Sequence, residues 1–153
     1  MSRTSSIQYQ YPGRQVWESF IFAHAAVFKR LEDEIQREAG MELSWFDVLV
    51  HLDRADDGRM NLQDLTNSVL LTQSGMSRLV DRMHRAGLVR KETSNADRRA
   101  VLVSLTPAGR AAFRRAYRVH VRGIEEHFMQ HVTADEAASM TEALRKVLQA
   151  ATE

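Results

Sequence analysis

The most constraining feature of the sequence is the segment 61–109, in which two short helical patterns precede two strand-like patterns. The second helical pattern begins at Thr72, whose hydroxyl can cap free helix amides, and ends before Gly87, which suits the left-handed position after a helix. Residues 88–93 and 100–105 are strand-like and flank a polar link, a pattern typical of a β-hairpin. The segment therefore predicts a helix-turn-helix followed by a hairpin.

The second helical pattern has two chemically different faces. The residues that follow the i, i+3, i+4, i+7 spacing of a buried stripe are Met76, Leu79, Val80 and Met83. The opposite face carries side chains that can hydrogen-bond to base edges or phosphates, namely Gln73, Ser74, Ser77, Arg78, Asp81 and Arg82. Amphipathic helices are common, so this pattern alone does not distinguish a DNA-reading helix from an ordinary surface helix.

Charge is strongly segregated along the chain, although the formal net charge is only +1. Residues 72–118 contain 11 basic and 3 acidic side chains, a net charge of +8. Residues 1–71 carry 7 basic against 11 acidic side chains and residues 119–153 carry 3 against 6, so these flanks are −4 and −3. A cationic block confined to the predicted reading helix, the hairpin and the next helix start is what neutralisation of DNA phosphates requires.

Length and composition limit the class of protein. With 153 residues and 44% hydrophobic side chains, the chain can bury one core, which predicts a single folding unit. The absence of cysteine excludes disulfides, cysteine metal sites and thiol redox switches. No stretch approaches the roughly 18 uninterrupted apolar residues of a membrane span. We therefore expect a soluble cytoplasmic protein without membrane contact, and a flexible tail at residues 1–13.

Helical patterns also precede the central segment. Residues 15–37 form a long pattern whose apolar arc is wider than one face of a monomer needs. Ser44, with Asp47 three residues on, resembles a capping box and predicts the start of a second helix. Asn61 predicts the start of a short supporting helix, 62–68.

Two further start signals follow the hairpin. Thr106 precedes a proline at the first helical position, and residues 133–136 read Thr-Ala-Asp-Glu, a full capping box. The order of elements is therefore helix, helix, short helix, reading helix, two-stranded hairpin, long helix and terminal helix. This order predicts a mainly α (α+β) fold, a winged helix-turn-helix with helical extensions at both ends.

Two motifs resemble those of a known family. Residues 97–106, Asp-Arg-Arg-Ala-Val-Leu-Val-Ser-Leu-Thr, match the wing signature of the MarR family of bacterial transcription regulators. Residues 71–83, followed by Ala-Gly-Leu-Val at 86–89, are equally typical of the reading helix in that family. The resemblance extends over residues 14–150 and implies a sequence-specific DNA-binding transcriptional regulator.

The resemblance also implies a homodimer. Residues 14–40 and 106–153 are expected to form the helical dimerisation region, and residues 41–105 the winged helix-turn-helix lobe. The wide apolar arcs of the outer helices agree with this, although the core of a monomer could also absorb them. Two reading helices related by a twofold axis enter successive major grooves roughly 34 Å apart, so we expect a pseudo-palindromic operator. The family's usual mode is repression.

The reading helix and the wing are expected to contact DNA. The candidate residues are Thr72, Gln73, Ser74, Ser77, Arg78, Arg82, Asp97, Arg98 and Arg99. Arg78 is the best candidate for bidentate contact to a guanine, whereas Thr72 and Arg82 are expected to hold phosphates. The resemblance implies that Asp97 pairs with Arg99 to brace the wing tip, and that one of the two wing arginines enters the minor groove.

The resemblance further implies a small aromatic or anionic effector, bound between the dimer helices and the DNA-binding lobe. The candidate lining residues are Trp17, Phe20, His24, Phe46 and Asp47, with Arg98 as a further polar member. Each of them also has a plainer interpretation as a core aromatic residue, a helix-start carboxylate or a wing arginine.

Other classes of function are less well supported. His127 and His131 lie one helical turn apart with His120 earlier on the same pattern, which could imitate a metal-binding stripe, but we expect neither a metal nor a cofactor. An enzyme is disfavoured because there is no glycine-rich phosphate loop and no nucleophile elbow. A winged-helix adaptor that binds other proteins stays open, but it does not need the cationic block.

Overall fold

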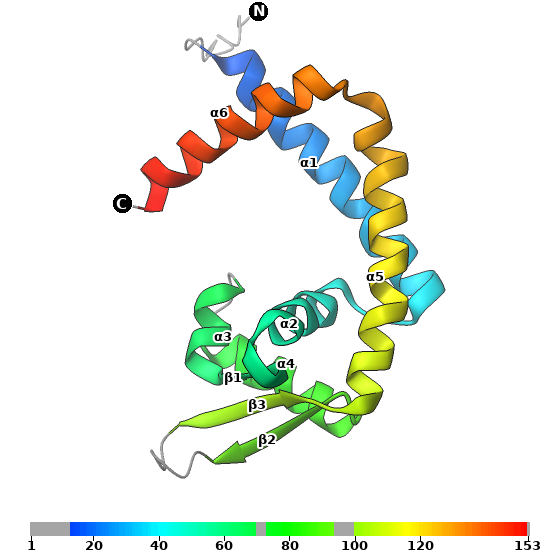
Figure 1. The fold of residues 1–153 in the computed structure, drawn as a ribbon, viewed down its shortest axis with the longest axis vertical. Coiled ribbons are helices and arrows are strands. Elements are labelled where there is room, and N and C mark those ends of the chain that lie inside the picture. The colour runs from blue at the N-terminus through cyan, green and yellow to red at the C-terminus, as the bar shows by residue number, and fades with distance from the viewer. Residues whose placement is uncertain (1–12, 70–72, 94–99, 153) are drawn as a thin grey trace, which may run out of the picture.

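The computed structural model describes residues 13–69, 73–93 and 100–152, and it confirms the predicted winged helix-turn-helix with helical extensions (Figure 1). In chain order the elements are α1 (Arg14–Glu34), η1 (Ile35–Ala39), α2 (Leu43–Arg54), η2 (Asp56–Gly58), β1 (Arg59–Asn61), α3 (Leu62–Ser68), α4 (Gln73–Arg85), β2 (Val89–Thr93), β3 (Val101–Leu105), α5 (Pro107–His127), η3 (Met129–His131) and α6 (Ala134–Thr152). No helix in these described ranges is long and apolar enough to cross a membrane.

Helices α2, α3 and α4 and a small sheet form the lower part of the molecule in Figure 1, here called the lobe. The sheet is antiparallel with the strand order β1-β3-β2, and Val89 of β2 lies opposite Leu105 of β3. Strand β1, which pairs with the other edge of β3, was not predicted. It is only three residues long, too short for an alternating pattern to stand out.

One hydrophobic core lies within the lobe and extends to α5. The largest fully buried side chains are Ile35, Phe46, Val48, Leu49, Leu52, Leu65, Met76, Val80, Met83, Val89 and Val103. Phe46 stacks on Phe113 of α5 with ring centroids 5.8 Å apart, which fastens α5 to α2. Glycine at position 109 lets the start of α5 pack against the lobe. The Cβ of any other residue there would lie 1.9 Å from the carbonyl oxygen of Leu88, which is too close.

Three predicted helix starts are confirmed. At the start of α3, the side chain of Asn61 accepts a hydrogen bond of 2.8 Å from the amide of Asp64. At the start of α5, the hydroxyl of Thr106 accepts one of 2.9 Å from the amide of Gly109. The capping box of α6 is reciprocal: the Glu136 amide donates to the Thr133 hydroxyl at 3.3 Å, and the Thr133 amide donates to the Glu136 carboxylate at 2.9 Å.

The capping box predicted at Ser44 is wrong. Helix α2 begins at Leu43, one residue before Ser44. Its N-cap is Glu42, and no side chain caps the helix. Ser44 therefore lies inside the first turn, and its hydroxyl donates to the Glu42 carboxylate at 3.3 Å. Asp47 lies one turn into the helix, half-buried, where it cannot reach the free amides; burial raises the pKa of its carboxyl.

Helices α1, α5 and α6, with the short turns η1 and η3, form the upper part of the molecule, here called the arm (Figure 1). Helix α5 rises from the lobe, α1 lies beside it, and α6 turns back across the N-terminal half of α1. Helix α6 has no buried residue in the isolated chain. The exposed large apolar side chains of the arm are Val16, Trp17, Phe20, Ile21, Phe22, Phe28, Tyr117, Val121, Met129, Met140, Leu144, Val147 and Leu148.

Candidate nucleic-acid interface

Helix α4 presents the candidate base-reading side chains to the outside of the lobe. Its predicted apolar stripe is confirmed: Met76, Val80 and Met83 are completely buried and Leu79 is almost so. Because that stripe fixes the rotation of the helix, the other face points outward. Ser74 and Arg78 on that face are exposed, and Ser77 is half-exposed. Gly87 follows α4 with φ 76°, as expected for a residue that ends a helix.

Arg82, the candidate phosphate contact on α4, is held by a second helix. Its two terminal nitrogens donate to the two carboxylate oxygens of Glu42, at 3.1 and 3.2 Å. The guanidinium carbon also lies 5.9 Å from the ring centroid of Trp45. Sequence reasoning missed this pairing, because Glu42 lies 40 residues earlier in the chain and no local spacing links the two.

Asp81, on the same face, serves the wing rather than an outside ligand. Its carboxylate accepts a short hydrogen bond from Lys91 of β2, and this bond holds the pKa of Asp81 below its usual value. A ring nitrogen of His84 also lies 3.0 Å from the carbonyl oxygen of Val89. These contacts tie β2 to α4, so the wing strands and the reading helix keep one relative orientation.

A groove of about 500 Å³ runs along the outer face of α4 beside the start of α2. The residues that line it are Ser44, Gly75, Arg78, Leu79, Asp81, Arg82 and Arg85. Three of the seven are arginines and one is an aspartate, so the groove suits a negatively charged ligand. This is the chemistry that a DNA phosphate backbone needs.

Some candidate residues cannot be placed. Thr72, Asp97, Arg98 and Arg99 lie outside the described residues. Gln73 is the first residue of α4, but its side chain is also outside the described part. The predictions for the wing tip therefore stay predictions.

The structure separates the candidate effector residues into two groups. Trp17, Phe20 and His24 form a row along α1, with successive ring centroids 6.3 Å apart. Phe46 and Asp47 lie on α2 in the lobe, and Phe46 is buried in the core. Leu31, near the end of α1, is the residue of this helix that is buried, and Trp17 lies about four turns before it, or roughly 20 Å along the helix axis. The groove that Phe20 and His24 line includes neither Phe46 nor Asp47.

The three histidines considered as a metal stripe have three different partners. The His120 ring packs against Phe46 at 4.7 Å between centroids, and burial lowers the pKa of His120. His131 is exposed on η3 and contacts Gln130. His127 instead bonds to Glu34 of α1 at 2.6 Å, a partner that the spacing of the histidines could not indicate.

The lobe, with its sheet and its outward-facing cationic helix, defines a winged helix-turn-helix protein. Residues 39–100 match the model of the MarR family. The multiple antibiotic resistance protein MarR of Escherichia coli (strain K12) is 32% identical over 73 residues, which are 48% of this chain and 51% of that protein. The chain thus spans about half the length of the curated relatives that it matches.

Solved structures extend the likeness to the arm. Sco3205, a MarR family transcriptional regulator from Streptomyces coelicolor solved in complex with DNA, shares 28% identity at a TM-score of 0.85, over 94% of this chain and 91% of that chain. AbsC, a MarR family regulator from the same organism, has the same fold, with 24% identity, a TM-score of 0.87, and coverage of 95% of this chain and 98% of that chain. The chain therefore resembles MarR family proteins in sequence over residues 39–100, and in fold over 94% of its length.

Proposed function

We propose that the protein is a sequence-specific DNA-binding transcriptional regulator, a repressor that binds a pseudo-palindromic operator as a homodimer. The observation that carries this proposal is the outer face of α4, where Ser74, Ser77 and Arg78 face outward beside a groove that contains three arginines. The DNA complex of Sco3205 supports it, because that relative shares the fold of both the lobe and the arm.

The homodimer follows from the exposed apolar surface of the arm. Val147 and Leu148 of α6 are 65% and 66% exposed, and Val16 and Phe22 of α1 are 75% and 71% exposed. Large apolar side chains with this exposure on two helices mark an interaction site rather than a solvated face. We assign a second copy of the chain as its partner, since a twofold dimer presents two identical reading helices to an inverted repeat.

Binding measurements on two arginines of α4 test the reading face. Arg78→Ala should cost about 1 to 3 kcal/mol on cognate DNA and relax the preference at one base pair, because a bidentate base contact is lost. Arg82→Ala should weaken binding to all sequences similarly. Arg145→Ala on α6 removes the same charge outside the lobe and is the matched control. Fluorescence anisotropy at several salt concentrations, on cognate and random duplexes, measures both effects.

Two outcomes would contradict the proposal. Equal losses on cognate and random DNA for both variants would mean that Arg78 does not read a base. Failure to bind any promoter fragment even at low salt would favour the protein-interaction adaptor instead. Footprints that reveal a direct repeat or a single half-site would exclude the twofold arrangement.

We also propose that a small aromatic or anionic effector relieves DNA binding. The supporting observation is a mostly apolar groove of about 780 Å³ between α1 and α6, which includes Phe20, His24 and Phe28. A thermal-shift screen with phenolic, salicylate-like and purine compounds tests this, and a stabilising compound should also lower DNA affinity. A screen in which none of these compounds stabilises the protein would favour a regulator controlled by its abundance alone.

A further inference from the structure

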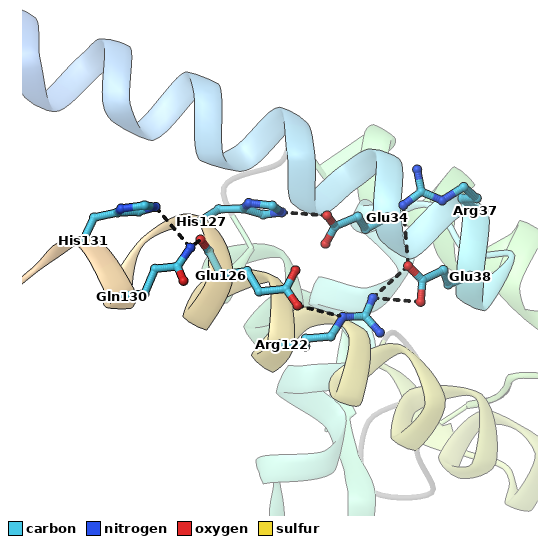
Figure 2. Close-up of polar contacts among 8 residues, drawn as sticks. All are labelled: Glu34, Arg37, Glu38, Arg122, Glu126, His127, Gln130 and His131. Atoms are coloured by element: carbon cyan, nitrogen blue, oxygen red, sulfur yellow. Dashed lines mark hydrogen bonds and ion pairs between the residues drawn. The ribbon is translucent and has the colours of Figure 1, made fainter.

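The C-terminal turns of α1 and α5 bring three metal-ligand side chains together, away from the DNA-binding face. Glu34 is the last residue of α1, and Glu126 and His127 end α5 (Figure 2). One donor atom from each of the three lies within 4.8 Å of the others. The sequence positions of Glu34 and His127 differ by 93, so only the packing of α1 against α5 unites them.

Two of the three side chains are largely removed from solvent. The Nε2 atom of His127 lies 2.6 Å from Oε1 of Glu34, and their side chains are only 17% and 14% exposed. The second carboxylate oxygen, Oε2 of Glu34, is buried and has no hydrogen-bond partner among the described residues. A buried carboxylate oxygen without a partner is costly, and a bound ion is one kind of partner that satisfies it.

Gly123 makes room for this carboxylate. A Cβ at that position would lie 2.8 Å from Oε2 of Glu34 and 2.5 Å from Cδ2 of Leu31. Glycine one turn before His127 therefore lets α1 and α5 approach closely enough for the carboxylate and the imidazole to meet.

Glu126 can complete the set with a small movement. Ligands of one tetrahedral ion with bonds of about 2.1 Å lie roughly 3.4 Å apart. Separations of up to 4.8 Å in the cluster therefore have to contract, and the 2.6 Å pair of His127 and Glu34 has to widen, if Oε1 is the ligand atom. The Glu126 side chain is 52% exposed, and its ion pair with Arg122 is long, at 3.8 Å. Arg122 has a stronger partner in Glu38, to which it donates at 2.7 and 2.8 Å (Figure 2).

We propose that Glu34, Glu126 and His127 form a binding site for a divalent transition-metal ion, and that Zn²⁺ is the ion that fits it best. One imidazole nitrogen with two carboxylates is a ligand set that zinc accepts, and water fills the remaining position. Calcium and magnesium prefer sets made of oxygen alone. The ion ties α1 to α5 in the arm.

Zinc titration of the full chain without a polyhistidine tag tests the site. After treatment with a chelator, isothermal titration calorimetry with zinc sulfate should give one ion per chain. Glu126→Gln and His127→Gln should each weaken binding at least tenfold, since even outer-shell partners of a metal contribute about 10- to 100-fold. Glu125→Gln, which changes the neighbouring exposed carboxylate, is the matched control and should bind zinc like the original protein.

A second measurement separates loss of a ligand from loss of the fold. Zinc should raise the melting temperature of the original chain and of Glu125→Gln, but not that of Glu126→Gln, whose exposed side chain the fold does not need. Cobalt(II) should give visible absorption bands that depend on His127. Loose, non-stoichiometric zinc uptake overturns the proposal, and so does stoichiometric binding that both ligand variants leave unchanged. Neither result bears on DNA binding.

Discussion

The lobe and the arm use apolar side chains in opposite ways. In the lobe, Phe46, Leu49 and Leu65 are at most 1% exposed and pack into one closed core. In the arm, α6 has 19 residues and buries none of them, and α1 buries only Leu31. Helix α5 is the exception in the arm, because it buries Phe113 and Val119 against the core of the lobe. The amphipathic patterns of the lobe thus find their partners within the same chain, whereas those of α1 and α6 largely do not.

This difference means that the two regions depend on different conditions. The lobe is a closed structure whose stability should be independent of protein concentration. The apolar faces of α1 and α6 need a surface from outside the chain, so their order should depend on association. The helix that we propose to read DNA belongs to the self-sufficient region, and the helices that we propose to form the dimer belong to the region that needs a partner.

The largest expected effect comes from a cavity in the lobe. Phe46→Ala should lower the free energy of unfolding by about 3 to 5 kcal/mol, because the ring is buried and stacks on Phe113 and His120. Leu148→Ala on α6 should give a loss that shrinks as the protein is diluted. Urea unfolding at several protein concentrations measures both. A loss at Leu148 that does not vary with concentration would mean that the arm is stable without a partner.

A charge on the apolar face of α6 tests the partner directly. Leu144→Glu should raise the dimer dissociation constant by more than about 100-fold, because an unpaired carboxylate would be buried at the interface. Light scattering should then report the 17.5 kDa chain instead of a particle twice that mass. Lys146→Glu places a carboxylate on the opposite face of α6 and should leave the dimer intact. If both variants remain dimeric, α6 does not form the interface.

The sequence predicted the lobe better than it predicted the site. Periodic patterns and caps such as Asn61 and Thr106 are local, so the helices and the order of elements could be predicted. The pairing of Arg82 with Glu42, and that of His127 with Glu34, joins residues 40 and 93 positions apart. Such pairs depend on how helices pack, which no local spacing encodes.

Removing a helix cap should have a smaller effect that differs between the regions. Asn61→Ala should destabilise the whole lobe by about 1 kcal/mol, because α3 starts within its closed structure. Thr133→Ala removes half of the capping box of α6 and should speed amide exchange in that helix alone. Hydrogen exchange by mass spectrometry measures both. Equal protection losses across the chain for the two variants would contradict the separation of lobe and arm.

Acidification should give the smallest effect, and it should reach the lobe first. Burial against Phe46 lowers the pKa of His120, so its contribution to stability is present above its ordinary value of about 6.5 and is lost as the pH falls below it. Hydrogen bonds from the amide and the hydroxyl of Thr133 lower the pKa of Glu136. That contribution to α6 is lost only below the ordinary value of about 4.5. As the pH falls, side-chain NMR titration should therefore record changes at the contact of His120 with the lobe first, while the Glu136 cap is still intact. The reverse order would show that the lobe is not the more acid-sensitive region.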